Sequence, residues 1–138
     1  MNLISSLSSP SLTVGALQYV LRHNDKFLMG LSEGQIVIYL LTRSKQGGFF
    51  GVVEPTELNK FKGILLIEPR EDYVYIKGFA KDCREARNML LHAAINTYSL
   101  TYSRVHTYRP DRRSVHRGAL REVCYSNGVR TANQLIKR

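Results

Sequence analysis

The spacing of apolar residues along the chain predicts an alternation of helical and extended segments. Between Thr13 and Leu31 apolar residues recur three or four positions apart, which indicates a helix, and the polar residues 23–25 break it into two. Residues 35–42 (QIVIYLLT) are mostly apolar and rich in β-branched side chains, which predicts a buried strand. A glycine turn at 45–48 leads to an extended segment at 49–54, so we expect these two strands to form a hairpin.

Two more extended segments lie in the middle of the chain. Residues 64–68 and 73–79 flank a turn, and we expect them to pair as neighbouring strands. Because side chains alternate along a strand, the second segment should present Val74, Ile76 and Gly78 on one face.

A helix with a recognisable start follows these strands. It is predicted over 83–98, with Asp82 as its N-cap and Glu85 three residues later completing a capping box. Three further segments follow: a strand at 100–108, a helix at 114–127 and a short strand at 131–136. The order of elements predicts an α/β or α+β domain, with helices packed on one central mixed or antiparallel sheet.

Length and composition fit one domain of this kind. The chain has 138 residues, of which 43% are hydrophobic, and we expect a serine-rich N-terminal arm at 1–12 followed by a single domain at 13–138. No apolar run approaches the roughly 20 residues that a membrane-spanning helix needs. Two distant cysteines and four histidines without i,i+4 spacing argue against a metal site. These features favour a cytoplasmic or virion protein.

Positive charge is concentrated at the C-terminal end. Residues 104–138 contain nine basic residues and two acids, so they carry +7 of the total net charge of +9. This basic segment suits a polyanionic partner: nucleic acid, an acidic protein surface or a phosphorylated cofactor. Tyrosines interleave with arginines there, a combination that suits phosphate contacts and base stacking. The candidate polyanion-binding residues are Arg104, Arg109, Arg112, Arg113, Arg117 and Arg121.

One motif resembles that of a known enzyme family. The strand-to-helix turn Lys81-Asp82-Cys83-Arg84-Glu85-Ala86 is similar to the Gln/Arg-x-x-Gly-x-Gly/Ala signature of GNAT (GCN5-related N-acetyltransferase) proteins. Residues 123–129 (VCYSNGV) match the spacing of the family's Leu-Tyr-x-x-x-Gly-Phe motif. The hairpin-rich front half and the β-α-β-α back half also resemble this fold. Tailed bacteriophages encode GNAT-like proteins of this size, some of them virion components.

The resemblance implies acetyl-coenzyme A as cofactor and an N-acyltransferase reaction. Its diphosphate would be held by backbone amides at the turn, which gives the candidate cofactor-binding residues Lys81, Cys83, Arg84, Glu85 and Ala86. Tyr125 would be the general acid, although Cys124 occupies the position that matches the family's tyrosine. Glu68, or alternatively Glu54, would accept a proton from the substrate amine.

Two features of the turn depart from the family pattern. Arg84 replaces a glycine that lets the backbone approach phosphate, and the acids Asp82 and Glu85 add negative charge there. A capped helix after a strand also needs no ligand. The sequence therefore leaves two hypotheses open: a GNAT-like domain with weak or no acyltransferase activity, and a non-enzymatic basic protein that binds nucleic acid or an acidic partner.

Overall fold

The computed structural model describes residues 1–27, 29–57, 59–69, 74–98 and 105–107. Its elements are β1 (Asn2–Ile4), α1 (Pro10–Arg22), α2 (Asn24–Phe27), α3 (Glu33–Lys45), β2 (Phe49–Val53), β3 (Phe61–Pro69), β4 (Val74–Lys81), α4 (Arg84–Tyr98) and β5 (Val105–Thr107). The expected helix at 114–127 and strand at 131–136 lie outside the described residues, as does most of the strand at 100–108.

A single sheet organises these elements. Its five strands lie in the order β1-β2-β3-β4-β5, and every neighbouring pair is antiparallel except β4 and β5, which are parallel. Helix α4 connects the two parallel strands, as a parallel connection requires a crossover. The predicted class, helices on one mixed sheet, is confirmed.

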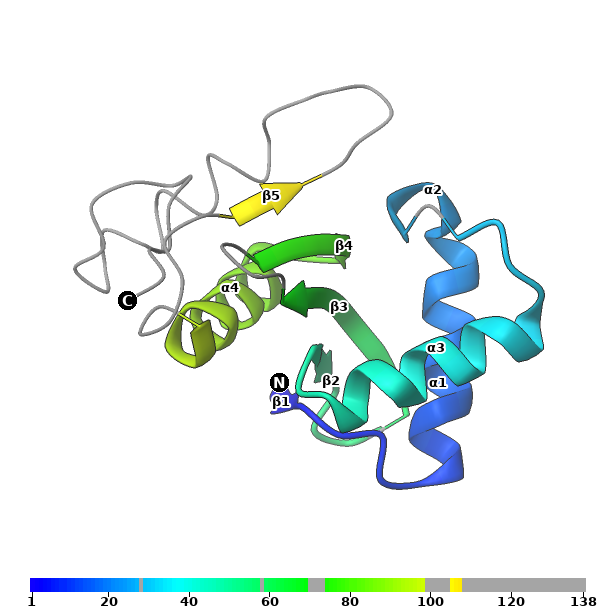
Figure 1. The fold of residues 1–138 in the computed structure, drawn as a ribbon. Helices are drawn as coiled ribbons and strands as arrows, with labels where there is room; N and C mark the ends of the chain where they lie inside the picture. The colour runs from blue at the N-terminus through cyan, green and yellow to red at the C-terminus, as the bar shows by residue number, and fades with distance from the viewer. Residues whose placement is uncertain (28, 58, 70–73, 99–104, 108–138) are drawn as a thin grey trace.

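The helices cover both faces of the sheet, so there are two hydrophobic layers. Figure 1 shows α1 and α3 on one side and α4 on the other. The first layer joins α1, α2 and α3 to the sheet through buried residues such as Ala16, Phe27 and Leu40. The second joins α4 to the sheet through Leu90 and Leu91 among others. This arrangement fixes where the two ends of β4 lie relative to the helices.

The predicted strand at 35–42 is wrong, because these residues belong to α3. Ser32 and Gln35 form a reciprocal capping box at the start of α3: the side chain of each accepts a hydrogen bond from the backbone amide of the other. These contacts satisfy N–H groups that have no partner within a helix, so they are specific to a helix start. Only one face of the apolar run is buried: Ile36 and Leu40 are covered, whereas Ile38 is 66% exposed. Strand β2 therefore pairs with β1 and β3, not with residues 35–42.

Residues 1–12, expected as an arm, contribute to the sheet and to α1. Strand β1 pairs with β2 from Asn2 opposite Val53 to Ile4 opposite Gly51. Pro10 then opens α1 at a position where proline is favoured, and the Ser9 side chain accepts a hydrogen bond from the Leu12 amide.

The expected pairing of the strands at 64–68 and 73–79 is confirmed as β3 and β4, with one irregularity. The register passes from Leu66 opposite Gly78 to Ile67 opposite Ile76, so Lys77 is an extra residue in β4. This bulge reverses the alternation that follows it. Gly78 consequently faces Phe27 on the α1–α3 side, and the expectation that it shares a face with Ile76 is wrong.

Candidate functional site

The junction between β4 and α4 carries the predicted cofactor-binding residues. Lys81 is half-buried, and Cys83, Arg84 and Glu85 are exposed. Ala86 is the exception, since it is fully buried on the face of α4 that packs against the sheet. The junction is thus open to solvent on its outer side and anchored on its inner side.

Small residues set how closely α4 approaches the sheet at this point. A Cβ atom added to Gly63 of β3 would lie 2.8 Å from Cδ1 of Leu90 and 3.6 Å from Cβ of Ala86. Larger side chains at either position would push the first turn of α4 away from the strands. The pair Gly63 and Ala86 therefore holds the helix start beside the end of β4.

The N-terminus of α4 differs from those of α1 and α3. Those helices begin with Ser9 and Ser32, whose hydroxyl groups accept hydrogen bonds from backbone amides of the first turn. In α4 the residue before the helix is Cys83, whose carbonyl accepts from the Arg87 amide at 3.1 Å. A thiol is a weak acceptor, so this N-cap leaves the first-turn amides of α4 poorly satisfied by the cap side chain.

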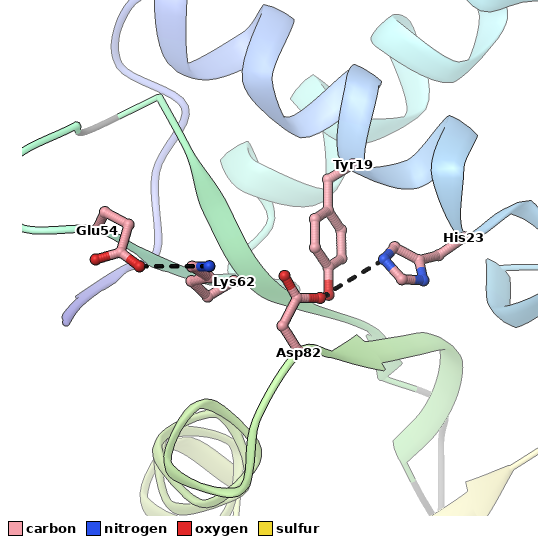
Figure 2. A network of polar contacts seen from close by, with 5 residues as sticks. All are labelled: Tyr19, His23, Glu54, Lys62 and Asp82. Carbon is pink, nitrogen blue, oxygen red and sulfur yellow. Dashed lines mark hydrogen bonds and ion pairs between the residues drawn. The ribbon is translucent and has the colours of Figure 1, made fainter.

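Asp82 does not occupy the capping position that the sequence predicts. Its backbone amide continues the strand by donating to the Lys62 carbonyl at 2.8 Å. Its carboxylate turns toward α1, where Oδ1 accepts a hydrogen bond from the Tyr19 hydroxyl at 2.9 Å and lies 3.6 Å from Nε2 of His23. Figure 2 shows this carboxylate directed at Tyr19 and His23 and away from α4. The helix therefore begins at Arg84, and the predicted capping box of Asp82 with Glu85 is wrong.

Tyr19 is the buried member of this group. Its side chain is 1% exposed, and desolvation by burial, followed by the hydrogen bond to Asp82, raises the pKa of its hydroxyl well above the usual range. The His23 ring lies 4.5 Å from the Tyr19 ring between centroids, and the Arg22 guanidinium lies 5.4 Å from the Tyr19 centroid. The hydroxyl therefore stays protonated and acts as a permanent donor to Asp82.

An ion pair lies next to this cluster. Nζ of Lys62 is 3.5 Å from Oε1 of Glu54, and both side chains are about 30% exposed. Figure 2 shows the pair beside Asp82 on neighbouring strands. Glu54, the alternative catalytic base in the sequence analysis, is thus paired with Lys62, the same residue whose carbonyl accepts the Asp82 amide.

These contacts change the electrostatics expected at the junction. Asp82 engages a hydroxyl donor and an imidazole on the far side from α4, so its charge is directed away from the first turn. Lys81 and Arg84 lie near that turn, with Nζ of Lys81 5.1 Å from the centroid of the Phe79 ring, and the helix N-terminus adds partial positive charge. Glu85 is the acid that still opposes an anion there. The arrangement suits a phosphate group better than the sequence alone indicates.

A shallow groove runs along α4 away from the junction. It has a volume of about 650 Å³. Leu3 of β1 lines one side, and the rest is lined by Arg84, Glu85, Asn88, Met89, His92, Ala93 and Asn96. The groove begins at the junction residues Arg84 and Glu85, so the two features are continuous.

The predicted catalytic residues are not brought together at the junction. Glu68 is half-buried, and its Oε2 accepts a hydrogen bond from the Tyr39 hydroxyl at 2.9 Å. It pairs with Tyr75, six residues before Lys81 on β4, which corresponds to about 20 Å of strand. Tyr125 lies outside the described residues, as do the six candidate arginines from Arg104 to Arg121.

Tyr19 and His23 were not identified from the sequence. They lie about sixty residues before Asp82, with 63 positions separating the hydrogen-bonded pair. Their spacing on one helical turn, i and i+4, is the only local signal, and it is equally typical of a packed helix face. Only the packing of α1 on the sheet reveals that these side chains share a carboxylate.

Within the described ranges, no group of three or more histidine, cysteine, aspartate or glutamate side chains is placed to hold a metal ion. Among the helices that the structure describes, none is long and apolar enough to cross a membrane. Comparison of the chain with protein-family models, with curated proteins and with solved structures finds no match.

Proposed function

We propose that this protein is a GNAT-like domain that binds acetyl-coenzyme A at the Lys81–Ala86 junction. The observation that carries the proposal is the β4-α4-β5 unit, in which two parallel strands are joined by a helix whose first turn is exposed at the carboxyl end of β4. In open sheets with such units, ligands bind outside the carboxyl ends of the strands, and helix N-termini hold their phosphates.

The order of strands supports the same proposal. Strands β2, β3 and β4 form an antiparallel meander, β1 adds to the β2 edge from before α1, and after β4 the chain changes to a β-α-β connection. The resemblance to GNAT proteins rests on a hairpin-rich front half and a β-α-β-α back half; the hairpins of β2, β3 and β4 and the β4-α4-β5 unit agree with it, whereas residues 35–42 are helical. A role in a bacteriophage, as a virion or accessory protein, rests on the resemblance alone.

The course of β4 supports a cofactor that extends back from the junction. The described pairing with β5 ends at Ile76, and β4 continues through Lys77 to Lys81. The bulge at Lys77 interrupts the ladder with β3, and such bulges are frequent beside active sites. A diphosphate held at Lys81–Ala86 would direct the pantetheine arm along this length of strand, toward the end where Glu68 lies.

When bound, the coenzyme supplies an acyl thioester, and transfer to an amine replaces its C–S bond with a C–N bond. Glu68 is the residue proposed to accept the proton that the amine loses, and its carboxylate is held in place by the Tyr39 hydroxyl. Tyr125 is proposed to give a proton to the departing sulfur. Lys81 and Arg84 would neutralise phosphate charge, and backbone amides of the exposed residues Cys83–Glu85 would donate to its oxygens.

Calorimetric titration with coenzyme A and with pantetheine, which lacks the diphosphate, tests the cofactor site. Arg84→Glu reverses a charge at an exposed position of the first turn and should weaken coenzyme A binding about tenfold or more, because a charge-assisted contact becomes a repulsive one. Pantetheine binding should not change. Lys45→Glu, the same reversal at an exposed residue near the end of α3, is the matched control.

The proposal fails if coenzyme A gives no binding heat at millimolar concentration, or if both charge reversals have the same effect. Ala86 is not a suitable position for this test. It is fully buried between α4 and the sheet, so a charged residue there would disrupt the helix start whether or not a ligand binds.

The basic segment at 104–138 supports a second candidate function, the binding of nucleic acid or an acidic protein surface. Its net charge of +7 is confined to one end of the chain, which solubility alone does not require. Affinity for a DNA or RNA oligonucleotide should fall steeply with salt, and the triple substitution of Arg112, Arg113 and Arg117 by alanine should reduce the slope. Binding to the oligonucleotide that is absent or independent of salt would exclude nucleic acid as the partner.

A further inference from the structure

Strand β1 lies at one edge of the sheet, and nothing in its sequence protects that edge from pairing. Within the part of the chain that the structure describes, β1 pairs with β2 alone, and its residues Asn2 and Leu3 are exposed. Edge strands of soluble proteins usually carry a charge, a proline or a bulge that prevents pairing with another chain. Residues 1–9 contain no charged side chain and no proline, and the register of β1 with β2 has no shift. The edge is therefore able to accept another strand.

The hydrogen-bond pattern of the sheet directs the backbone of Leu3 toward this edge. The amide of Ile67 donates to the Gly48 carbonyl at 2.8 Å, so the backbone of Gly48 points toward β3. Backbone groups alternate in direction along a strand, and the odd-numbered residues of β2 consequently point toward β1. Their partners in the register are Asn2 and Ile4, which therefore bond to β2. The N–H and C=O groups of Leu3 point the other way, to the free edge.

The side chain of Leu3 lies on the same face of the sheet as α4. It lines the groove along α4, whereas the next residue, Ile4, packs against the buried residues of the α1–α3 layer. Leu3 is 42% exposed, so much of its apolar surface has no cover in the monomer. Directly opposite residues of antiparallel strands share a face and lie in contact. A strand added to this edge would therefore place a side chain against Leu3 at the mouth of the groove.

We propose that this edge binds the same edge of a second copy of the protein, with the two β1 strands antiparallel and Leu3 opposite Leu3 on a two-fold axis. The edge is self-complementary, because each Leu3 offers one donor, one acceptor and an apolar side chain, and needs the same set opposite it. Charge favours this location: the chain carries +9, but its first charged side chain is Arg22, so the two strands meet without like-charge repulsion between them. A three-residue strand makes a small contact, so the dimer is transient and forms at high protein concentration.

Sedimentation equilibrium of the full chain, from about 10 μM to about 1 mM, tests for the dimer in the range of weak complexes. The average mass should rise with concentration. Leu3→Lys places two like charges opposite each other at the edge and should raise the dimer Kd about tenfold or more. Leu21→Lys is the matched control, since Leu21 is 39% exposed on α1, and it should leave the Kd unchanged. A chain that stays monomeric at about 1 mM overturns the proposal and leaves the edge to a strand of a different protein.

Cross-linking tests the pairing itself. The Cα atoms of a hydrogen-bonded antiparallel pair lie about 5.5 Å apart, which a disulfide can span. In a chain with Cys83→Ser and Cys124→Ser, the variant Leu3→Cys should form a covalent dimer on addition of diamide, much faster than Leu21→Cys does. Equal rates for the two cysteine variants, or a dimer that Leu3→Lys and Leu21→Lys weaken equally, would place the contact elsewhere and overturn the proposal. None of these outcomes depends on the proposed cofactor site.

Discussion

Replacing Gly15 with alanine should destabilise the protein, although the same change usually stabilises a helix. Gly15 is buried in the middle of α1, where alanine has a propensity advantage of about 1 kcal/mol over glycine. A Cβ atom at this position would lie 2.1 Å from the carbonyl oxygen of Asn59 and 3.0 Å from its carbonyl carbon. Because the obstacle is backbone, no side-chain rotation relieves it.

The magnitude follows from these two opposing effects. Forcing a methyl group into a packed contact costs about 1–3 kcal/mol, and more where the backbone has to move. After the gain in helix propensity, we expect a net loss of about 1–2 kcal/mol, which for a chain of this size lowers Tm by roughly 4–8 °C. Thermal and urea denaturation followed by circular dichroism measure this change.

Gly34→Ala provides the matched control. Gly34 lies in the first turn of α3 with no atom within 4 Å of the added Cβ, so alanine there should be neutral or stabilise by up to about 1 kcal/mol. Tyr19 lies one turn beyond Gly15, so a displaced α1 should also weaken the Tyr19–Asp82 hydrogen bond. If Gly15→Ala is as stable as Gly34→Ala, α1 does not pack this closely on the loop before β3, and the reasoning is refuted.

Three further measurements test other parts of the structure. The raised pKa of Tyr19 means that the folded state keeps its hydroxyl protonated. The contribution of this hydroxyl to the free energy of unfolding is therefore complete below pH 10 and decreases above it. The stability difference between wild type and Tyr19→Phe should therefore fall by about 1.4 kcal/mol per pH unit above about pH 10, and a constant difference would contradict the buried hydrogen bond. Ser32→Ala should lower the free energy of unfolding by about 1 kcal/mol, measured by urea denaturation, because it removes the cap of α3. Ser6→Ala, at an exposed position before α1, is the control and should change stability little. Equal losses in the two variants would argue against the capping box. Leu90→Ala should cost about 2–5 kcal/mol, since Leu90 is fully buried between α4 and β3, and a loss below 1 kcal/mol would place α4 away from the sheet.

Elements with strong local signals were predicted well. The hairpin of β3 and β4 and the helix α4 follow from alternation, turn residues and helical periodicity within short windows. The strand predicted at 35–42 could have been recognised as a helix from the local sequence, because Ser32 and Gln35 have the spacing of a capping box. The apolar run outweighed the capping box in the prediction. Ile38 is exposed on α3, and this extra apolar residue makes the segment as apolar throughout as a buried strand.

The bulge at Lys77 shows a different kind of failure. A regular alternation along 73–79 is consistent with the sequence, and nothing near Lys77 marks it as an extra residue. The register with β3 introduces the irregularity, and Gly78 then fits against the ring of Phe27, 2.1 Å from where a Cβ would lie. Pairing between strands and packing against α2 decide this feature together.

By itself, the sequence determined the class of the fold, the strand-to-helix junction at Lys81–Ala86 and the concentration of basic residues toward the C-terminal end, because each depends on neighbours along the chain. The tertiary structure decided how that junction is used. Asp82 has the local chemistry of a helix cap, yet a buried hydroxyl 63 residues away needs an acceptor and takes its carboxylate. A contact between distant residues outweighs the local preference because leaving a buried donor unpaired costs more than leaving an exposed helix end to water.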